Sequence, residues 1–280
     1  MFDEFIIQNN SSLHNSTLTI EKNCKISCVI YNSIRGGQIY TNGSQIKIHG
    51  GIIQNSNNES NRNINVASEE EEIKNHIGTI DIGGGIDFLN CKGIEINNLS
   101  IKKCNSRNGG GIYLSNSSLK ISNSELNGNF AEGYGGAIFC ADNNSEIDLY
   151  NTKILNNSTQ DGSGGGIYAY GNLIIDGENS LISNNETGTY GGGMIIKTDC
   201  QIKNCSICNN KAKHSGGGIC VDGNLFLEKA KIYLNSCDVR GGGIYYSNSK
   251  NFLYDKNKIG SMVYDNSAGT SGNNFYPEIN

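Results

Sequence analysis

The sequence predicts an all-β fold, a single right-handed parallel β-helix of about nine to ten coils with three short strands in each coil. The first sign is a run of two or three glycines followed by an aliphatic residue, which returns about every 25 to 30 residues. An alternating apolar pattern follows most runs, and an aliphatic-x-x-Asn pattern comes after it. Such a period indicates a solenoid, because each repeat buries its apolar face only against its neighbours.

The glycine runs are expected to form one corner of each coil. Copies occur at 36–37, 83–86, 109–112, 135–138, 164–167, 191–194, 216–219 and 241–244. A phosphate-binding loop would place Lys and Ser or Thr directly after the last glycine, ahead of a helix. Strand-like Ile-Tyr or Ile-Asp follows here, so the runs are interpreted as sites of positive φ or close backbone packing.

The alternating pattern predicts short strands with one buried face. It occurs at 46–48, 94–96, 119–121, 147–149, 173–175 and 225–227. A period of two excludes the helical repeats, whose apolar residues recur at period 3.6. Counting from each glycine run, we expect the first and third following residues to point into the coil and the second to point out.

The recurring asparagines predict a ladder at a turn of the coil. Its expected members are Asn55, Asn129, Asn157, Asn185, Asn210, Asn235 and Asn266, whereas one coil carries Cys104 at this position. Asparagine tolerates the left-handed conformation, and its amide can bond the neighbours above and below.

The chain is expected to form one domain over residues 1–280, with an inserted charged loop at about 57–77. This insertion contains the acidic run 69–72 and interrupts the repeat. We interpret it as an exposed loop, with a contact to a partner as the alternative.

Composition excludes several classes of function. The net charge is −5 and no basic stripe is visible, which argues against nucleic acid as a partner. No stretch approaches eighteen apolar residues, so no direct membrane span is expected, and the first residues lack the basic and apolar regions of a secretory signal. No cofactor is expected, and the oligomeric state stays open.

The cysteines raise one alternative, a metal site. Cys200, Cys205 and Cys208 have the C-x4-C-x2-C spacing of plant-type iron–sulfur proteins. Cys200 and Cys205, however, fall at positions that point inward in other coils. We therefore predict buried core thiols and no metal.

The outward column after the glycine runs is the candidate binding surface. Its aromatic members are Tyr40, Tyr113, Phe139, Tyr168 and Tyr245, and its other members are Asp87, Ile195 and Cys220. Exposed aromatic rings offer flat faces to a glycan or a protein partner. The alternative is that the rings only stabilise the sheet or lie beneath loops.

An enzyme would need carboxylates gathered on one outward face. The column above holds one carboxylate, and no catalytic residues are predicted. The outward column assigned to the second strand is Lys47, Glu95, Lys120, Asp148, Ile174, Lys203 and Phe226. Its alternating charges indicate a solvated ladder of weak pairs rather than an acid–base site.

The repeat resembles that of the chlamydial polymorphic outer-membrane proteins, which pairs Gly-Gly-Ala-Ile with Phe-x-x-Asn. Residues 135–138 match the first motif literally, and Ile, Leu or Val replaces Phe in the second. The resemblance implies a pectin-lyase-like β-helix and a surface-exposed adhesion role. We therefore expect a non-enzymatic adhesion or interaction module, extracellular or at a cell surface. The alternatives are a polysaccharide lyase or glycoside hydrolase of the pectin-lyase-like superfamily, and a purely structural repeat segment of a larger surface protein.

Overall fold

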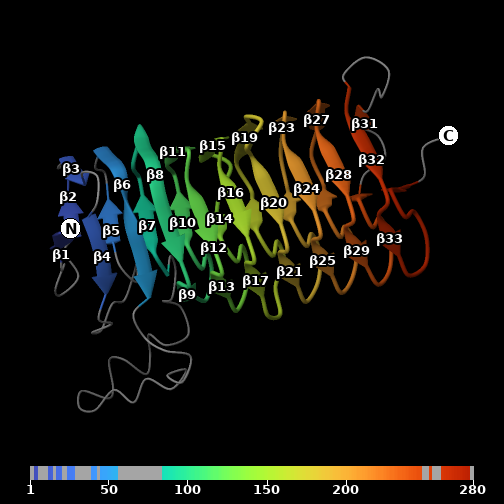
Figure 1. The fold of residues 1–280 in the computed structure, drawn as a ribbon, viewed down its shortest axis with the longest axis horizontal. Helices are drawn as coiled ribbons and strands as arrows, with labels where there is room; N and C mark the ends of the chain where they lie inside the picture. The colour runs from blue at the N-terminus through green and yellow to red at the C-terminus, as the bar shows by residue number, and fades with distance from the viewer. Residues whose placement is uncertain are drawn as a thin grey trace, which may run out of the picture.

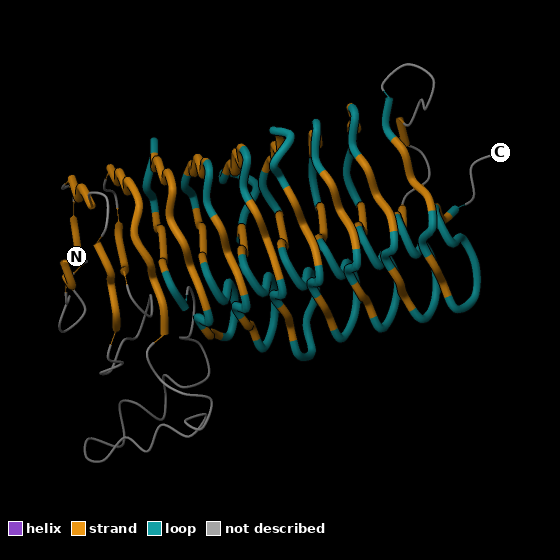
Figure 2. The backbone as a smooth tube through the Cα atoms, in the orientation of Figure 1, coloured by secondary structure: helices purple, strands orange, loops and turns teal. Residues whose placement is uncertain are grey.

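The computed structural model describes residues 84–247 and 260–277 in full. It also places the strand backbones at 3–5, 12–14, 17–20, 24–28, 39–42, 45–55 and 252–253. The inserted segment at 57–77 lies outside the described residues. Every described element is a strand, and the strands stack turn upon turn into a parallel β-solenoid (Figures 1 and 2). The predicted fold class is confirmed.

Three sheets form the walls of the solenoid. The ten-stranded sheet contains β2 (Ser12–His14), β5 (Ile39–Asn42), β7 (Ile86–Leu89), β10 (Ile112–Ser115), β14 (Ile138–Cys140), β18 (Ile167–Ala169), β22 (Met194–Ile196), β26 (Ile219–Val221), β30 (Ile244–Tyr246) and β34 (Phe275–Tyr276). The seven-stranded sheet contains β9 (Asn105–Ser106), β13 (Phe130–Ala131), β17 (Ser158–Thr159), β21 (Glu186–Thr187), β25 (Lys211–Ala212), β29 (Ser236–Cys237) and β33 (Ser267–Ala268), along the lower edge of Figure 1.

The third sheet has seventeen strands because each turn contributes two of them or one long strand. Its members are β1 (Asp3–Phe5), β3 (Thr17–Ile20), β4 (Cys24–Cys28), β6 (Gln45–Asn55), β8 (Ile94–Lys102), β11 (Ser118–Ser122), β12 (Glu125–Asn127), β15 (Glu146–Tyr150), β16 (Lys153–Leu155), β19 (Asn172–Asp176), β20 (Leu181–Ser183), β23 (Cys200–Lys203), β24 (Ser206–Cys208), β27 (Leu225–Glu228), β28 (Lys231–Tyr233), β31 (Phe252–Leu253) and β32 (Met262–Tyr264).

The coil count differs from the prediction. About six turns, from β7 to β29, are complete and described without a break, against the nine to ten expected. The glycine repeat marks turns on either side of these six, but those turns include residues outside the described part of the chain. The number of glycine runs therefore gives the number of corners, which is larger than the number of complete three-walled turns described.

Each turn is built around inward aliphatic residues. The first strand residue after the glycine run is fully buried in the described turns, as at Ile86, Ile112 and Ile138. The third residue, such as Leu114, is also fully buried. Together with the inward residues of the seventeen-stranded wall they form one continuous apolar core along the axis.

The glycine corner has two steric causes. Gly109, the first glycine of its run, has φ of 66°, which L-residues with a Cβ rarely adopt. Gly110, the second, would place a Cβ 2.3 Å from the carbonyl oxygen of Gly136 in the next turn. The close stacking of successive turns therefore requires glycine at this corner.

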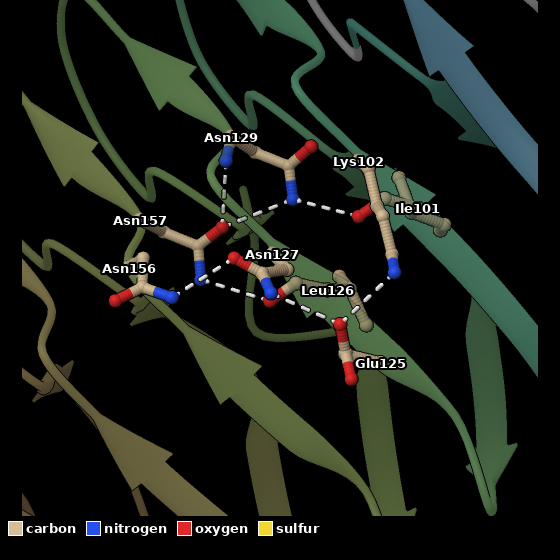
Figure 3. A network of polar contacts seen from close by, with 8 residues as sticks. All are labelled: Ile101, Lys102, Glu125, Leu126, Asn127, Asn129, Asn156 and Asn157. Atoms are coloured by element: carbon tan, nitrogen blue, oxygen red, sulfur yellow. Dashed lines mark hydrogen bonds and ion pairs between the residues drawn. The ribbon is translucent and has the colours of Figure 1, made fainter.

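The asparagines form a buried column at the junction between the seventeen-stranded and seven-stranded walls (Figure 3). The backbone N–H and the side-chain Nδ2 of Asn129 donate to Oδ1 of Asn157 at 2.9 and 3.0 Å, and Nδ2 also donates to the carbonyl oxygen of Ile101 at 3.1 Å. The same pattern links Asn157, Asn185, Asn210, Asn235 and Asn266. Each amide thus satisfies three buried polar groups of neighbouring turns.

One detail of the ladder differs from expectation. The left-handed residue is not the ladder asparagine but the residue before it, as at Asn156, Asn184 and Asn209. That residue turns the chain so that the next side chain points inward. The side chain of Asn55 lies outside the described part of the structure.

The ladder ends on asparagines of the last glycine corner. Oδ1 of Asn274 accepts from the backbone N–H and Nδ2 of Asn266 at 3.2 and 3.0 Å, and Oδ1 of Asn273 accepts from the N–H of Ala268 at 2.9 Å. In Gly242-Gly243 of the preceding run, a Cβ would meet carbonyl oxygens of the next corner. At the next corner Asn274 replaces glycine and bonds the ladder residue Asn266, and Asn273 bonds the backbone of β33.

Candidate functional site

The outward face of the ten-stranded sheet carries the predicted aromatic column, here called the floor. Its described side chains are Tyr113, Phe139, Tyr168, Ile195, Cys220 and Tyr245, aligned by the strand register. Asp87 precedes Tyr113 in this register and is fully buried. Tyr40 pairs with Asp87, but its side chain lies outside the described residues.

The expectation that the floor is an exposed stripe is wrong for its central residues. Phe139 is 8 % exposed and Tyr168 only 5 % exposed, and with Ile195 and Cys220 they form a second apolar cluster separate from the coil interior. Tyr113 and Tyr245 are partly buried against it. The outward direction was predicted correctly, but side chains on both flanks cover the column.

The floor rings pack edge to face along the axis. The ring centroids of Tyr113 and Phe139 are 5.6 Å apart, and those of Phe139 and Tyr168 are 5.5 Å apart, with interplanar angles of 60° and 72°. This geometry is favourable for aromatic pairs. The floor thus stabilises the sheet over three successive turns.

The first flank is the column of residues just before the glycine runs, here called the glycine-side rim. Its members are Asn108, Tyr134, Ser163, Tyr190, Ser215, Arg240 and Ser271, aligned by backbone hydrogen bonds between turns. Tyr134 leans over the floor, with its ring 5.7 Å from Phe139 and 4.8 Å from Tyr168. Tyr134 remains 43 % exposed.

The second flank lies two residues beyond the floor in each turn and is here called the strand-end rim. Its members are Ser115, Ala141, Tyr170, Lys197, Asp222 and Ser247, again aligned by backbone bonds. The Tyr170 ring lies 5.2 Å from Tyr168, and the Tyr170 side chain is 38 % exposed. Nζ of Lys197 lies 5.8 Å from the Tyr168 ring.

A polar pair continues the strand-end rim. Lys197 donates a charge-assisted hydrogen bond to Oδ2 of Asp222, and the Ser247 hydroxyl donates to Oδ1 of the same carboxylate. Burial lowers the pKa of Lys197, but the contact with Asp222 outweighs it, so the pKa is raised above its usual value. Burial, and then the neighbouring Tyr170 hydroxyl, raise the pKa of Tyr168 far above its usual value. Tyr168 therefore keeps its hydroxyl proton, beside a lysine that is paired with Asp222.

Aromatic side chains also pack against one another in the C-terminal part of the face. The Tyr190 ring lies 4.3 Å from the His214 ring. Tyr245 stacks on Tyr276 at 5.6 Å, and the Arg240 guanidinium lies 4.9 Å from the Tyr276 ring. Partly buried rings thus continue along the floor register at Tyr245 and Tyr276 and along the glycine-side rim at Tyr190.

Tyr134 and Tyr170 are the exposed rings that the sequence interpretation missed. Each has a signal in the sequence, since Tyr134 directly precedes a glycine run and Tyr170 follows Tyr168 by two residues. Tyr170 directly follows β18, two residues after Tyr168, and the alternation of the strand carries its ring to the same face, 5.2 Å from the Tyr168 ring. Aromatic residues recur in the floor at a fixed place after the glycine runs, which made that column visible in the sequence. Each rim carries tyrosine in only one or two turns.

The outward column of the second wall needs one correction. Gln201, not Lys203, pairs with Ile174 and Phe226. Lys203 pairs with Glu228 instead, with Nζ 3.5 Å from a carboxylate oxygen. The sequence alignment was two residues out of register at this strand.

The described cysteines are all buried free thiols. Burial raises the pKa of Cys140 to about 11 and that of Cys220 to about 12, which suppresses the thiolate. Cys200 and Cys205 pack in the apolar core, where their pKa values are also raised by burial. Within residues 84–247 and 260–277, no group of three His, Cys, Asp or Glu side chains is placed to hold a metal ion.

One shallow depression lies on the seventeen-stranded wall. It measures about 370 Å³ and is lined by Asn98, Leu99, Ser100, Asn123, Ser124, Glu125, Asn151, Lys153 and Asn179. Glu125 is held by Lys102 at 3.3 Å and by Asn127 at 3.0 Å (Figure 3). These contacts, the bond to Asn127 foremost, outweigh partial burial and lower the pKa of Glu125. This carboxylate is therefore part of a surface network rather than a poised acid.

The described part of the chain contains no helix long and apolar enough to cross a membrane. Comparison of the chain with protein-family models, with curated proteins and with solved structures finds no match.

Proposed function

We propose that this protein is a non-enzymatic interaction module, in which a rigid β-solenoid displays the aromatic face of its ten-stranded sheet to a glycan or protein partner. The resemblance of its repeats to those of polymorphic outer-membrane proteins supports an extracellular or cell-surface location and an adhesion role. It likewise favours a pectin-lyase-like β-helix.

The observation that carries the proposal is the ring cluster of Tyr134, Tyr168 and Tyr170. Tyr168 is buried between the other two, which stay about two-fifths exposed while packed against it. Tyrosines held in this way present apolar ring area together with a polar tip, and little side-chain entropy remains to be lost on binding. Such anchors are typical of recognition surfaces.

The contacts between turns make the solenoid rigid, which suits the display of a binding surface. The asparagine ladder, the glycine corners and the floor all tie neighbouring turns together along the axis. A rim residue on one turn is therefore held at a fixed distance from the same position on the next turn. This rigidity suits a surface that binds without rearrangement.

The enzyme alternative finds little support on this face. Of the described carboxylates on or beside this face, Asp87 is buried, Asp222 is bound by Lys197 and Ser247, and Asp142 accepts hydrogen bonds from Ser115 and Ser145. Acid–base chemistry on a polysaccharide uses two carboxylates facing one bond, each with a tuned pKa. The purely structural alternative accounts for the floor, but not for the exposed rings of the rims.

A glycan array tests the proposal with three proteins: wild type, the double variant Tyr134→Ser/Tyr170→Ser, and Tyr150→Ser. Serine already occupies both rim columns in other turns, so the double variant is expected to fold. Tyr150 is 51 % exposed at the end of β15, on a different wall, and serves as the control. We expect binding by the wild type and the control and its loss in the double variant. Equal binding by all three proteins would contradict the proposal.

A further inference from the structure

Two tyrosine rings of the glycine-side rim stand two turns apart. Tyr134 and Tyr190 occupy the same position on turns separated by one intervening turn, where Ser163 stands. Parallel strands stack about 4.8 Å apart, which places the two backbone positions about 9.6 Å apart along the axis. An extended β-linked polysaccharide presents the same face of its rings at every second sugar and advances by a similar length in two sugars. The spacing of these two rings thus matches the length of one disaccharide.

Both rings are held by neighbours while remaining accessible. Tyr134 stacks on Phe139 with an interplanar angle of 29°, and Tyr190 lies against His214 at 37°. Tyr134 is 43 % exposed and Tyr190 is half-buried. A ring already held by its neighbours loses little freedom when a sugar stacks on its open side, which favours binding.

The charges beside the rings favour an uncharged ligand. The only cation in the strand-end rim, among its described residues, is Lys197, and its charge is matched by Asp222. The glycine-side rim carries Arg240 two turns beyond Tyr190, where its guanidinium lies 4.9 Å from the Tyr276 ring. Sugar hydroxyls both donate and accept hydrogen bonds, so they can bond to the ammonium, the carboxylate and the Ser247 hydroxyl without breaking the pair. An acidic chain would compete with Asp222 for Lys197 and meet its repulsion.

We infer that the ligand of this face is a neutral, extended β-linked polysaccharide that lies along the solenoid axis, stacked on Tyr134 and Tyr190 beside the Lys197–Asp222 pair. The inference rests on the proposed function and specifies its ligand class. It requires binding to depend on chain length, because a disaccharide reaches one ring and a longer chain reaches both.

Calorimetric titration with cello-oligosaccharides, as di-, tetra- and hexasaccharides, tests the inference on the full chain. Affinity should rise about tenfold or more from the disaccharide to the hexasaccharide as the second ring is engaged. Tyr134→Ser and Tyr190→Ser should each weaken hexasaccharide binding about five- to tenfold and abolish most of the length dependence. Tyr150→Ser is the matched control and should bind as the wild type does.

Two further probes test linkage and charge. Maltohexaose contains the same sugar in an α-linkage that coils the chain, and oligogalacturonate is acidic. Binding of either as tight as that of cellohexaose would overturn the inference. Absence of cello-oligosaccharide binding would also overturn it, but the proposed function would stand if array binding still required Tyr134 and Tyr170. If array binding did not depend on Tyr134 and Tyr170, both the proposed function and the inferred ligand class would be contradicted.

Discussion

The asparagine ladder and the floor of the aromatic face are both columns of stacked residues, but they differ in uniformity. The ladder column is asparagine in every described turn from Asn129 to Asn266, with Cys104 in the turn before them, whereas the floor varies. A ladder asparagine accepts from one neighbour and donates to the other, so a different residue in one turn leaves polar groups of two turns without partners. A floor residue has only to fill space beside its neighbours, and Tyr, Phe, Ile and Cys all do so. A uniform column therefore marks a requirement of the fold, whereas a varied column marks a surface on which sequence can change.

The largest effect is expected from a substitution that interrupts the asparagine ladder at its centre. Asn185→Ala removes the acceptor for the backbone N–H and Nδ2 of Asn157 and the donor to the carbonyl of Ile154. Nδ2 of Asn185 also donates to Oδ1 of Asn210, so four buried polar groups lose a partner. We expect a loss of about 3 kcal/mol or more in the free energy of unfolding, measured by urea denaturation.

The control for this change lies just outside the ladder in Figure 3. Asn127 bonds the Glu125 carboxylate and accepts from Asn156 at the surface, where water can replace it. Asn127→Ala should cost less than about 1 kcal/mol. Similar losses in the two variants would show that the ladder is no more demanding than the surface network.

The second prediction separates the floor from its rims. Tyr168→Ala opens a cavity beneath Tyr134 and Tyr170 and should cost about 3 kcal/mol of unfolding free energy. Tyr134→Ser, at a partly exposed position, should cost less than about 1 kcal/mol. Thermal or urea unfolding of both variants measures the difference. A Tyr168→Ala protein as stable as the wild type would mean that the floor is not structural.

The sequence was sufficient to predict the fold class, because the glycine corner and the inward aliphatic residues are local and repeat. It also predicted the direction of each floor side chain, since direction follows from strand alternation alone. Exposure could not be predicted in the same way. Whether Tyr168 is buried depends on Tyr134 from the preceding turn and on Lys197 from the following turn, and neither lies in its own strand.

Other misses have equally specific causes. The left-handed residue was assigned to the ladder asparagine because both properties suit asparagine, but the chain divides them between neighbours such as Asn156 and Asn157. Lys203 was placed in the wrong column although Cys200 was correctly assigned inward. Alternation from Cys200 makes Gln201 the outward residue, and Lys203 ends the same strand two residues later. The rim residues carry no repeat and thus gave no periodic signal.

The third prediction concerns the end of the ladder. Asn274→Ala removes the acceptor for the backbone N–H and Nδ2 of Asn266. This site is only partly buried, so water can compensate, and we expect a loss of about 1–2 kcal/mol, smaller than that at Asn185. Asn273→Ala, which frees only the exposed N–H of Ala268, should cost less. Hydrogen exchange of the Asn266 amide reports the local opening, and unchanged exchange in Asn274→Ala would count against this cap.

The smallest expected effect lies at the edge of the aromatic face, at Asp142. Burial alone raises its pKa, but the hydrogen bonds from the N–H of Asn116 and the hydroxyls of Ser115 and Ser145 outweigh burial and hold the pKa below its usual 3.8. A lowered folded-state pKa adds stability at pH values above the unfolded-state pKa, and this stability is lost as pH falls through the folded-state value.

We therefore expect wild type to lose more stability between pH 7 and pH 3 than Asp142→Asn, by less than about 1 kcal/mol because the carboxylate is only partly buried. Urea midpoints at the two pH values measure this difference. The amide can still accept from Ser115 or Ser145, so the variant should differ little from wild type at pH 3, where the wild-type carboxylate is losing its charge. An equal pH dependence in both proteins would show that these hydrogen bonds do not favour the charged form. In that case polar contacts at the rim would be tolerant of change, as the varied floor is, and the buried asparagine column alone would impose strict requirements on the sequence.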